Sequence, residues 1–158
     1  MQSLLVTAAQ IGERLRMRGE SVAVVESSAG GLIAAALLAQ PGASAFFLGG
    51  AVVYTRQARE ALLGITPADM AGIRSASEPY ALLLAGRLRE RLGATWGLAE
   101  TGAAGPAGNS YGDAAGHSCF AIVGPVESAH TIESGSADRW ANMRLFASTA
   151  LTLLNEKL

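Results

Sequence analysis

The stretch that decides the fold is VVESSAGGLIAAALLA, residues 24–39. It opens with the β-branched residues of a buried strand and closes with an apolar run typical of a helix. Glu26, Ser27, Ser28, Gly30 and Gly31 lie where the strand passes into the helix. A helix that starts there presents backbone N–H groups and the positive end of its dipole, which suit phosphate or carboxylate. The same residues also fit a serine-capped helix with glycines chosen for packing, since no G-x-x-x-x-G-K-[ST] motif is present.

Helices and strands alternate along most of the chain. Apolar spacing predicts helices over 3–18, 30–39, 56–64, 77–93 and 138–156, with a short helical turn over 66–72. Strands are predicted over 21–26, 45–55, 95–100, 117–124 and 128–135, the last two as a hairpin. The first of these strands is too apolar to face solvent, so we expect it inside the sheet. The order predicts one α/β domain over residues 1–158, a three-layer α/β/α sandwich with a mixed sheet.

Composition excludes several classes of protein. The 158 residues are 50% hydrophobic and 16% charged, with a net charge of −1, so we expect no nucleic-acid partner. The apolar runs are too short for a membrane helix and no leader is recognisable, which predicts a cytoplasmic protein with no membrane partner. The single cysteine, Cys119, excludes an intrachain disulfide and a cysteine metal cluster, and we expect no metal or cofactor. So much apolar surface in a short chain predicts a homo-oligomer.

A second glycine-rich turn, ETGAAGP at 100–106, follows another buried strand. In an open α/β sheet, the carboxyl ends of parallel strands face one crevice. Thr101, Gly102 and Gly105 are therefore candidates for binding another part of the same ligand. An ordinary glycine-rich connection is the alternative interpretation.

Ser44 and Tyr54 flank the predicted strand 45–55. Serine is a common nucleophile in acyl chemistry, but it needs a base. His117 and His130 stand in no recognisable triad order, and no G-x-S-x-G elbow is present. Lys157, the only lysine, is next to the C-terminal residue, and arginine keeps its proton. The local sequence pattern therefore gives no reason to choose Ser44 over the other serines as a nucleophile.

Taken in order, ESSAGG (26–31), PGAS (41–44), YT with the following RQAR (54–59), ETGAAGP and ADRWANMR (137–144) resemble the motifs of one family. The chain is similar to the CinA C-terminal domain family, the nicotinamide-nucleotide amidases, over residues 20–145. The resemblance implies a three-layer α/β fold that commonly forms oligomers. It also implies hydrolysis of the carboxamide of nicotinamide mononucleotide, giving nicotinic acid mononucleotide and ammonia.

The resemblance also implies roles for particular residues. Ser44 matches the serine that attacks the carboxamide, Tyr54 a tyrosine that orients or relays its proton, and Arg59 the position where many members carry lysine. The implied substrate-binding residues are Glu26, Ser27, Ser28, Gly30, Gly31, Thr101, Gly102, Gly105, Arg139 and Arg144. An arginine fork suits a phosphate or a developing oxyanion.

The sequence departs from the family pattern at several positions. Ser28 and Ala29 replace Cys and Thr of the first motif, and GNSYGDAAGHSC (108–119) replaces K-P-V-G. Because Arg59 keeps its proton, either Tyr54 ionises partly beside it or His117 acts as the base. Two alternatives therefore stand beside the amidase: a nucleotide-binding paralogue without catalysis, and a hydrolase of another amide or ester that uses His117.

Overall fold

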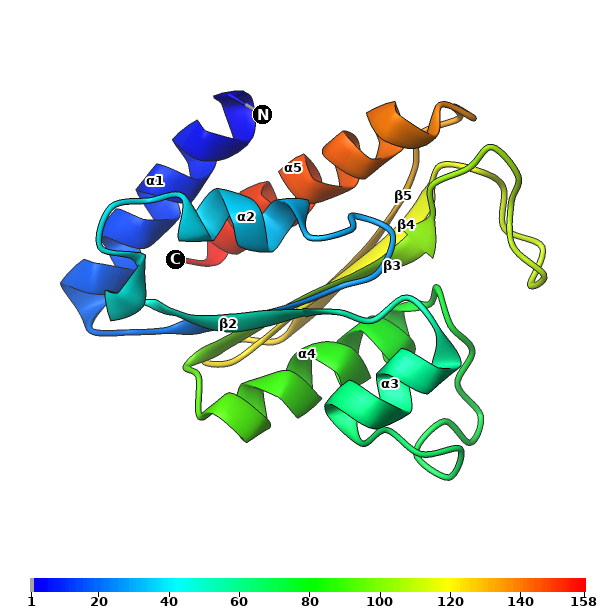
Figure 1. Ribbon diagram of the computed structural model, residues 1–158, viewed down its shortest axis with the longest axis horizontal. Helices are drawn as coiled ribbons and strands as arrows, with labels where there is room; N and C mark the ends of the chain where they lie inside the picture. The colour runs from blue at the N-terminus through cyan, green and yellow to red at the C-terminus, as the bar shows by residue number, and fades with distance from the viewer. Residues whose placement is uncertain (1) are drawn as a thin grey trace.

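The computed structural model describes residues 2–158, which form one five-stranded sheet with helices on both faces (Figure 1). In chain order the elements are α1 (Gln2–Arg18), β1 (Val22–Glu26), α2 (Leu32–Leu38), a 3-10 turn (Ala43–Ala45), β2 (Phe47–Val52), α3 (Arg56–Leu63), α4 (Glu78–Leu92), β3 (Trp96–Ala103), β4 (His117–Val123), β5 (Ser128–Glu133) and α5 (Arg139–Lys157). None of the helices within residues 2–158 combines the length and apolarity needed to cross a bilayer.

The sheet has the strand order β2-β1-β3-β4-β5. β1 pairs in parallel with both β2 and β3, whereas β3, β4 and β5 pair antiparallel. The mixed sheet is therefore confirmed, and β1 lies inside it as its apolar sequence predicts. The parallel pairing also brings the carboxyl ends of β1, β2 and β3 to the same edge of the sheet.

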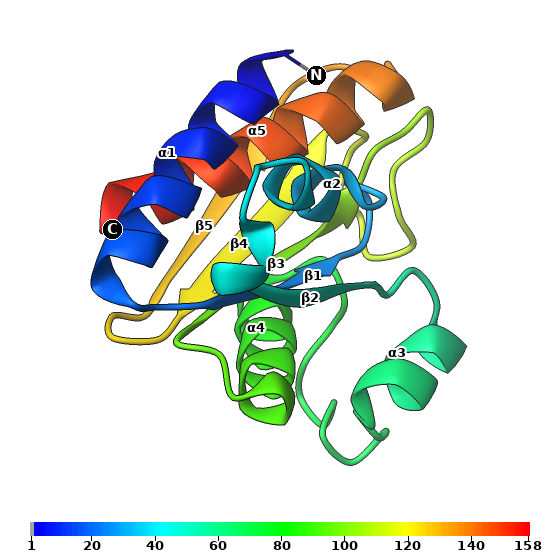
Figure 2. The same cartoon turned by 60° about the vertical axis from the view of Figure 1, so that its left-hand side comes forward.

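Helices form the two outer layers. α1, α2 and α5 cover one face, and α3 and α4 cover the other (Figures 1 and 2). Each layer encloses a hydrophobic cluster, one around Ile11, Phe46 and Phe146 and the other around Leu63 and Leu84. All five β1 residues are buried because helices cover both faces of the strand. The predicted three-layer α/β/α sandwich is confirmed.

Several predicted boundaries need correction. Residues 66–72 form a turn and no helix, although Thr66 and Asp69 exchange the hydrogen bonds of a helix cap. β3 continues to Ala103 because β4 pairs along its full length. The helices predicted over 77–93 and 138–156 are present. The Ser77 and Asp138 side chains cap them by accepting the backbone N–H groups three residues ahead, and α4 and α5 follow.

Candidate active site

A contiguous groove opens where β1, β2 and β3 end. Its middle section, the strand-end cavity, has a volume of about 340 Å³. On one side lies a section of about 430 Å³, here the arginine pocket, and on the other a section of about 310 Å³ beside the 102–109 loop, here the glycine-loop cavity. Tyr54 and Gly102 line the middle section and the glycine-loop cavity, and Arg59 and Tyr111 line the middle section and the arginine pocket. The predicted crevice at the carboxyl edge is therefore present.

The structure brings eight of the predicted site residues to this groove. Ser27, Tyr54, Arg59, Thr101 and Gly102 line the strand-end cavity, and Ser28, Gly105 and Arg139 line the glycine-loop cavity. They come from three strand ends, from α3 and from the start of α5, so residues that are more than a hundred positions apart in sequence share one surface.

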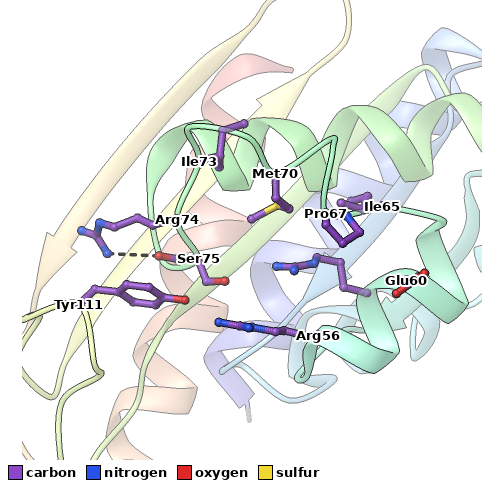
Figure 3. Close-up of a pocket in the computed structure, with 10 residues that line it drawn as sticks. Arg56, Glu60, Ile65, Pro67, Met70, Ile73, Arg74, Ser75 and Tyr111 are labelled. Atoms are coloured by element: carbon purple, nitrogen blue, oxygen red, sulfur yellow. Dashed lines mark hydrogen bonds between the residues drawn. The ribbon is translucent and has the colours of Figure 1, made fainter.

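Positive charge gathers in the arginine pocket. In Figure 3 Arg56 of α3 and Tyr111 of a loop point toward each other across the pocket, and Arg74 lies beside the Tyr111 ring at its edge. Arg74 is held by Asp113 through two contacts of 2.7 and 3.1 Å. Arg56 and Arg59 have no salt bridge among residues 2–158, and the buried Arg59 Nε has no hydrogen-bond partner there. Buried donors are normally satisfied, so the unpaired Arg59 Nε is an unusual feature of the pocket wall.

The start of α2 is already occupied by carboxylates of the chain itself. Glu26 accepts the backbone N–H groups of Gly31, Ile33 and Ala34 at 2.9–3.0 Å. Glu100 accepts those of Ser27 and Ala29 at 3.1 and 2.8 Å. The prediction that these N–H groups bind a substrate anion is therefore wrong, because internal carboxylates satisfy them.

Burial raises the pKa of both carboxyl groups. It raises the pKa of Glu26 to about 7, although the hydrogen bonds from the α2 backbone oppose the shift and the charge of Glu100 adds to it. Burial likewise raises the pKa of Glu100, against the hydrogen bonds that it accepts from Ser28, Ala29, Ser27 and Ser118. Glu26 and Glu100 act as an internal brace beneath the groove.

Tyr54 and Arg139 meet above the glycine loop. Arg139 donates to the Tyr54 hydroxyl oxygen at 3.1 Å and to the backbone carbonyl of Gly105. Tyr54 is 62% exposed, so its hydroxyl is accessible from solvent. Thr101, in contrast, is buried in β3. A guanidinium and a phenol thus lie together beside a glycine-rich backbone.

Ser44 does not reach this groove. It lies exposed in the 3-10 turn before β2, whereas Tyr54 follows the end of β2. A six-residue strand spans about 20 Å, so the two side chains belong to opposite edges of the sheet. The prediction that Ser44 and Tyr54 of one chain share a crevice is wrong.

Four further residues that were predicted to bind the substrate do not line the groove. Glu26 braces α2, and Gly30 and Gly31 form the turn before α2 with φ values of +68° and +99°. Arg144 lies over the ring of Trp140, 5.9 Å from its centroid, and does not line the groove. These positions have structural explanations that need no ligand.

His117 is a buried structural residue. Its Nδ1 lies 2.5 Å from a Glu133 carboxylate oxygen, and its Nε2 lies 2.8 Å from the Ala76 carbonyl. Burial opposes the charged ring, but Glu133, the Ala76 carbonyl and Asp113 together raise the pKa of His117. Both nitrogens are already engaged with acceptors, which argues against His117 as a general base.

Arg56, Ser75 and Tyr111 also line the groove, although no sequence motif marks them as site residues. Arg56 and Arg59 stand three residues apart on a helix that begins just after Tyr54, a spacing that could have revealed the pair. Ser75 and Tyr111 reach the pocket through long loops, which leave no local pattern. Among the residues that the structure describes, no three His, Cys, Asp or Glu side chains group as metal ligands.

Known proteins are similar to this chain in sequence. A CinA-like protein of Desulfosudis oleivorans is 38% identical over 156 residues, which are 98% of this chain and 38% of that protein. A CinA-like protein of Myxococcus xanthus is 38% identical over 155 residues. This chain therefore spans well under half the length of these relatives.

Solved structures are similar over nearly their whole length. A competence-damaged protein (CinA) superfamily protein of Klebsiella pneumoniae 700603 has a TM-score of 0.90 at 26% identity, covering 98% of this chain and 96% of that one. A competence/damage inducible protein of Agrobacterium tumefaciens has a TM-score of 0.88 at 30% identity, covering 96% and 93%. The profile of the CinA C-terminal domain matches residues 5–158. The chain belongs to the CinA C-terminal domain family.

Proposed function

We propose that this chain hydrolyses the carboxamide of nicotinamide mononucleotide to nicotinic acid mononucleotide and ammonia. The observation that carries the proposal is the groove itself, which has unpaired arginines at one end and the Tyr54–Arg139 pair at the other. A pyridine mononucleotide has the matching layout, with a phosphate at one end and a carboxamide at the other. Membership of the CinA C-terminal domain family supports this substrate class.

The phosphate belongs in the arginine pocket. Arg56 and Arg59 are free of carboxylate partners within residues 2–158, and Arg59 has a buried donor to satisfy. Guanidinium groups bind phosphate through paired, charge-assisted hydrogen bonds. The α2 N-terminus is no competitor, because Glu26 and Glu100 accept its N–H groups.

The carboxamide belongs beside Tyr54 and Arg139. Arg139 fixes the Tyr54 hydroxyl from one side, which leaves the phenol placed to orient a nucleophile or to relay its proton. The positive charge of Arg139 and the glycine-loop backbone can stabilise the oxyanion that forms on the amide oxygen.

The reaction proceeds through an acyl-enzyme. A serine hydroxyl attacks the amide carbon, its proton passes to the departing nitrogen, and the C–N bond breaks to release ammonia. Water then attacks the ester, giving the carboxylate and restoring the serine hydroxyl. The resemblance assigns the attack to Ser44, and since Ser44 lies at the other edge of the sheet, the hydroxyl must come from another copy of the chain.

The test is ammonia release from nicotinamide mononucleotide. We expect release by the wild-type chain, loss in Ser44→Ala, and partial retention in Ser27→Ala, the serine that lines the groove within one chain. Release that survives Ser44→Ala but disappears in Ser27→Ala would move the nucleophile to Ser27. No release by folded wild-type protein would overturn the proposal.

A second candidate is a paralogue that binds a nucleotide without hydrolysing it. The position of Ser44 outside the groove of its own chain favours this function. A ligand that binds only the folded state raises the melting temperature by mass action. A melting shift with nicotinamide mononucleotide, without ammonia at any protein concentration, would support this candidate over the amidase.

A further inference from the structure

We propose that His117 is a positioning residue for the groove: its imidazolium ties together residues 74–76 and 109–113, two loop segments that form part of the groove wall. Only the identity of the ligand, a pyridine mononucleotide, rests on the proposed function. The protonation of the ring and its hold on the loops can be tested without any ligand.

Hydrogen-bond geometry fixes the charge of His117. The residue is 5% exposed, its Nε2 lies 2.8 Å from the carbonyl oxygen of Ala76, and its Nδ1 lies 2.5 Å from a carboxylate oxygen of Glu133. Carbonyl and carboxylate oxygens accept hydrogen bonds, so both ring nitrogens must donate and the ring is an imidazolium. The pKa of His117 is raised accordingly: burial opposes the charge, but Glu133, the Ala76 carbonyl and Asp113 together outweigh it.

The first loop segment is held through the backbone of Ala76. Ala76 has a φ of +54°, a left-handed conformation that residues with a Cβ rarely adopt without support from the surrounding structure. The hydrogen bond from His117 Nε2 to its carbonyl supplies such support. Arg74 and Ser75 line the arginine pocket, and Ser75 and Ala76 line the strand-end cavity. The imidazolium therefore fixes the backbone that carries this wall of the groove.

The second loop segment is held through the carboxylate of Asp113. One of its oxygens lies 3.6 Å from His117 Nε2 and 2.7 Å from a nitrogen of Arg74. The same oxygen accepts Asn109 Nδ2 at 2.7 Å, and Asn109 Oδ1 accepts the backbone N–H of Tyr111 at 3.0 Å. Arg74 also lies 5.4 Å from the centroid of the Tyr111 ring (Figure 3). Because Tyr111 lines both the arginine pocket and the strand-end cavity, this network sets the position of its ring in the groove.

The ionisable groups around the His117 ring come from several parts of the fold. They are Glu133 of β5, Cys119 of β4, Asp113 of the loop with its partner Arg74, and Glu78 of α4, which reaches Cys119 through Thr131. Burial raises the pKa of the Cys119 thiol, and the hydrogen bond from Arg74 lowers the pKa of Asp113. Cys119 and Asp113 therefore keep their charge states around neutral pH, where the ring titrates.

Loss of the ring proton removes one of the two N–H groups. A bare nitrogen 2.5 Å from the Glu133 carboxylate is repelled, and a bare nitrogen facing Ala76 leaves its carbonyl without this donor. Asp113 also loses a positive charge 3.6 Å away. Binding in the groove should therefore be strongest below the pKa of the folded-state ring. It should weaken roughly tenfold as the pH rises through that pKa, the equivalent of about one hydrogen bond to a charged group.

Proton NMR tests the charge of the ring. The His117 signal, identified by its absence in His117→Gln, should titrate above the pH of about 6.5 that is usual for histidine. Glu133→Gln removes the negative partner of Nδ1 from a side chain that is 57% exposed, and it should move the midpoint to lower pH. A wild-type midpoint no higher than that of an ordinary histidine, or one that Glu133→Gln leaves in place, would overturn the imidazolium.

Backbone NMR tests the hold on the loops. The amide signals of Tyr111 and Asp113 should shift with the midpoint of the His117 ring, and Glu133→Gln should displace both midpoints together. His130→Gln, which removes an exposed histidine from β5, is the matched control and should leave both where they are. Loop signals that do not follow the ring would contradict the hold.

Calorimetric titration with nicotinic acid mononucleotide, which the proposed amidase does not consume, tests the effect on the groove. Affinity in the wild type and in His130→Gln should fall roughly tenfold across the His117 midpoint, and Glu133→Gln should show the same fall at lower pH. The phosphate of the ligand titrates identically in all three proteins, so the displacement between the profiles isolates the ring. A merely structural His117 would give superimposed profiles, and that result would overturn the positioning role.

Failure of the proposed function has a separate signature. Folded protein that neither binds nicotinic acid mononucleotide nor releases ammonia would remove the amidase, while loop signals that follow the ring would keep His117 as the residue that holds the groove wall. Binding and ammonia release with superimposed pH profiles would keep the amidase and remove the positioning role.

Discussion

The two ends of β2 have opposite chemistry. Its carboxyl end leads to Tyr54, Arg56 and Arg59, which line a groove of polar and charged groups. Its amino end follows Ser44 in a short exposed turn, and the strand between them carries only apolar residues and glycines. Residues that flank one strand are close in sequence but about 20 Å apart in the fold. A motif that spans a strand therefore describes a site within one chain only if both of its halves lie at the same edge of the sheet.

The largest effect should come from removing charge at the carboxyl end. Arg56→Ala with Arg59→Ala should weaken binding of nicotinamide mononucleotide by roughly 100-fold or more, since hydrogen bonds to charged groups contribute about 1.5–3 kcal/mol each. Calorimetric titration measures the change. Arg144→Ala, which removes an arginine outside the groove, is the matched control and should bind normally. Unchanged affinity in the double variant would place the phosphate elsewhere.

The free energy of unfolding should also distinguish the buried carboxylates beneath the groove from the exposed turn that carries Ser44. Glu100→Ala removes the acceptor of the Ser27 and Ala29 N–H groups and should lower the free energy of unfolding by about 3 kcal/mol, since buried donors are left unpaired. Ser44→Ala, on the exposed turn, should change it by less than about 0.5 kcal/mol. Denaturant unfolding of both variants measures the difference. Equal small losses would contradict the internal brace.

The pH dependence of stability should reveal the buried Glu26. Its pKa is near 7 in the folded chain against 4.5 unfolded, so the folded state binds more protons between these values. Stability from this group should therefore fall as the pH rises from about 4.5 to 7, with a slope of up to about 1.4 kcal/mol per pH unit. Glu26→Gln should flatten that slope in urea unfolding measured at each pH. A wild-type slope identical to that of Glu26→Gln would contradict the shift.

The smallest effect should appear at the rim of the arginine pocket. A hydrogen bond from Ser75 and the charges of Arg56 and Arg59 lower the pKa of Tyr111. Ultraviolet titration, with Tyr111→Phe subtracted to isolate this phenol, should show ionisation below the usual pH of about 10. Arg56→Ala should move it back upward, whereas Arg144→Ala should leave it unchanged. An ordinary Tyr111 titration would indicate that the arginines do not face the phenol.

Much of the fold could be predicted from local signals. The helices predicted to begin at 77 and 138 are present with Ser77 and Asp138 as their caps, and the apolar run before Glu26 forms an interior strand. Parallel strands end at one edge of the sheet, and this rule correctly predicts that Ser27, Tyr54 and Thr101 line the same cavity.

The rest of the site depended on contacts that no local pattern reveals. The motif predicts Glu26 as a ligand-binding residue, but Glu26 accepts the N–H groups of the helix that follows it. Glu100 reaches the same turn from a strand more than seventy residues away. Tyr111 enters the arginine pocket on a loop whose course follows from tertiary packing.

The most direct test of the proposed binding mode is a crystal structure of this chain with nicotinic acid mononucleotide bound. We expect the phosphate within hydrogen-bond distance of Arg56 and Arg59, and the pyridine carboxylate beside Tyr54 and Arg139. A mononucleotide bound with its phosphate at the N-terminus of α2, or away from the ends of β1, β2 and β3, would contradict it.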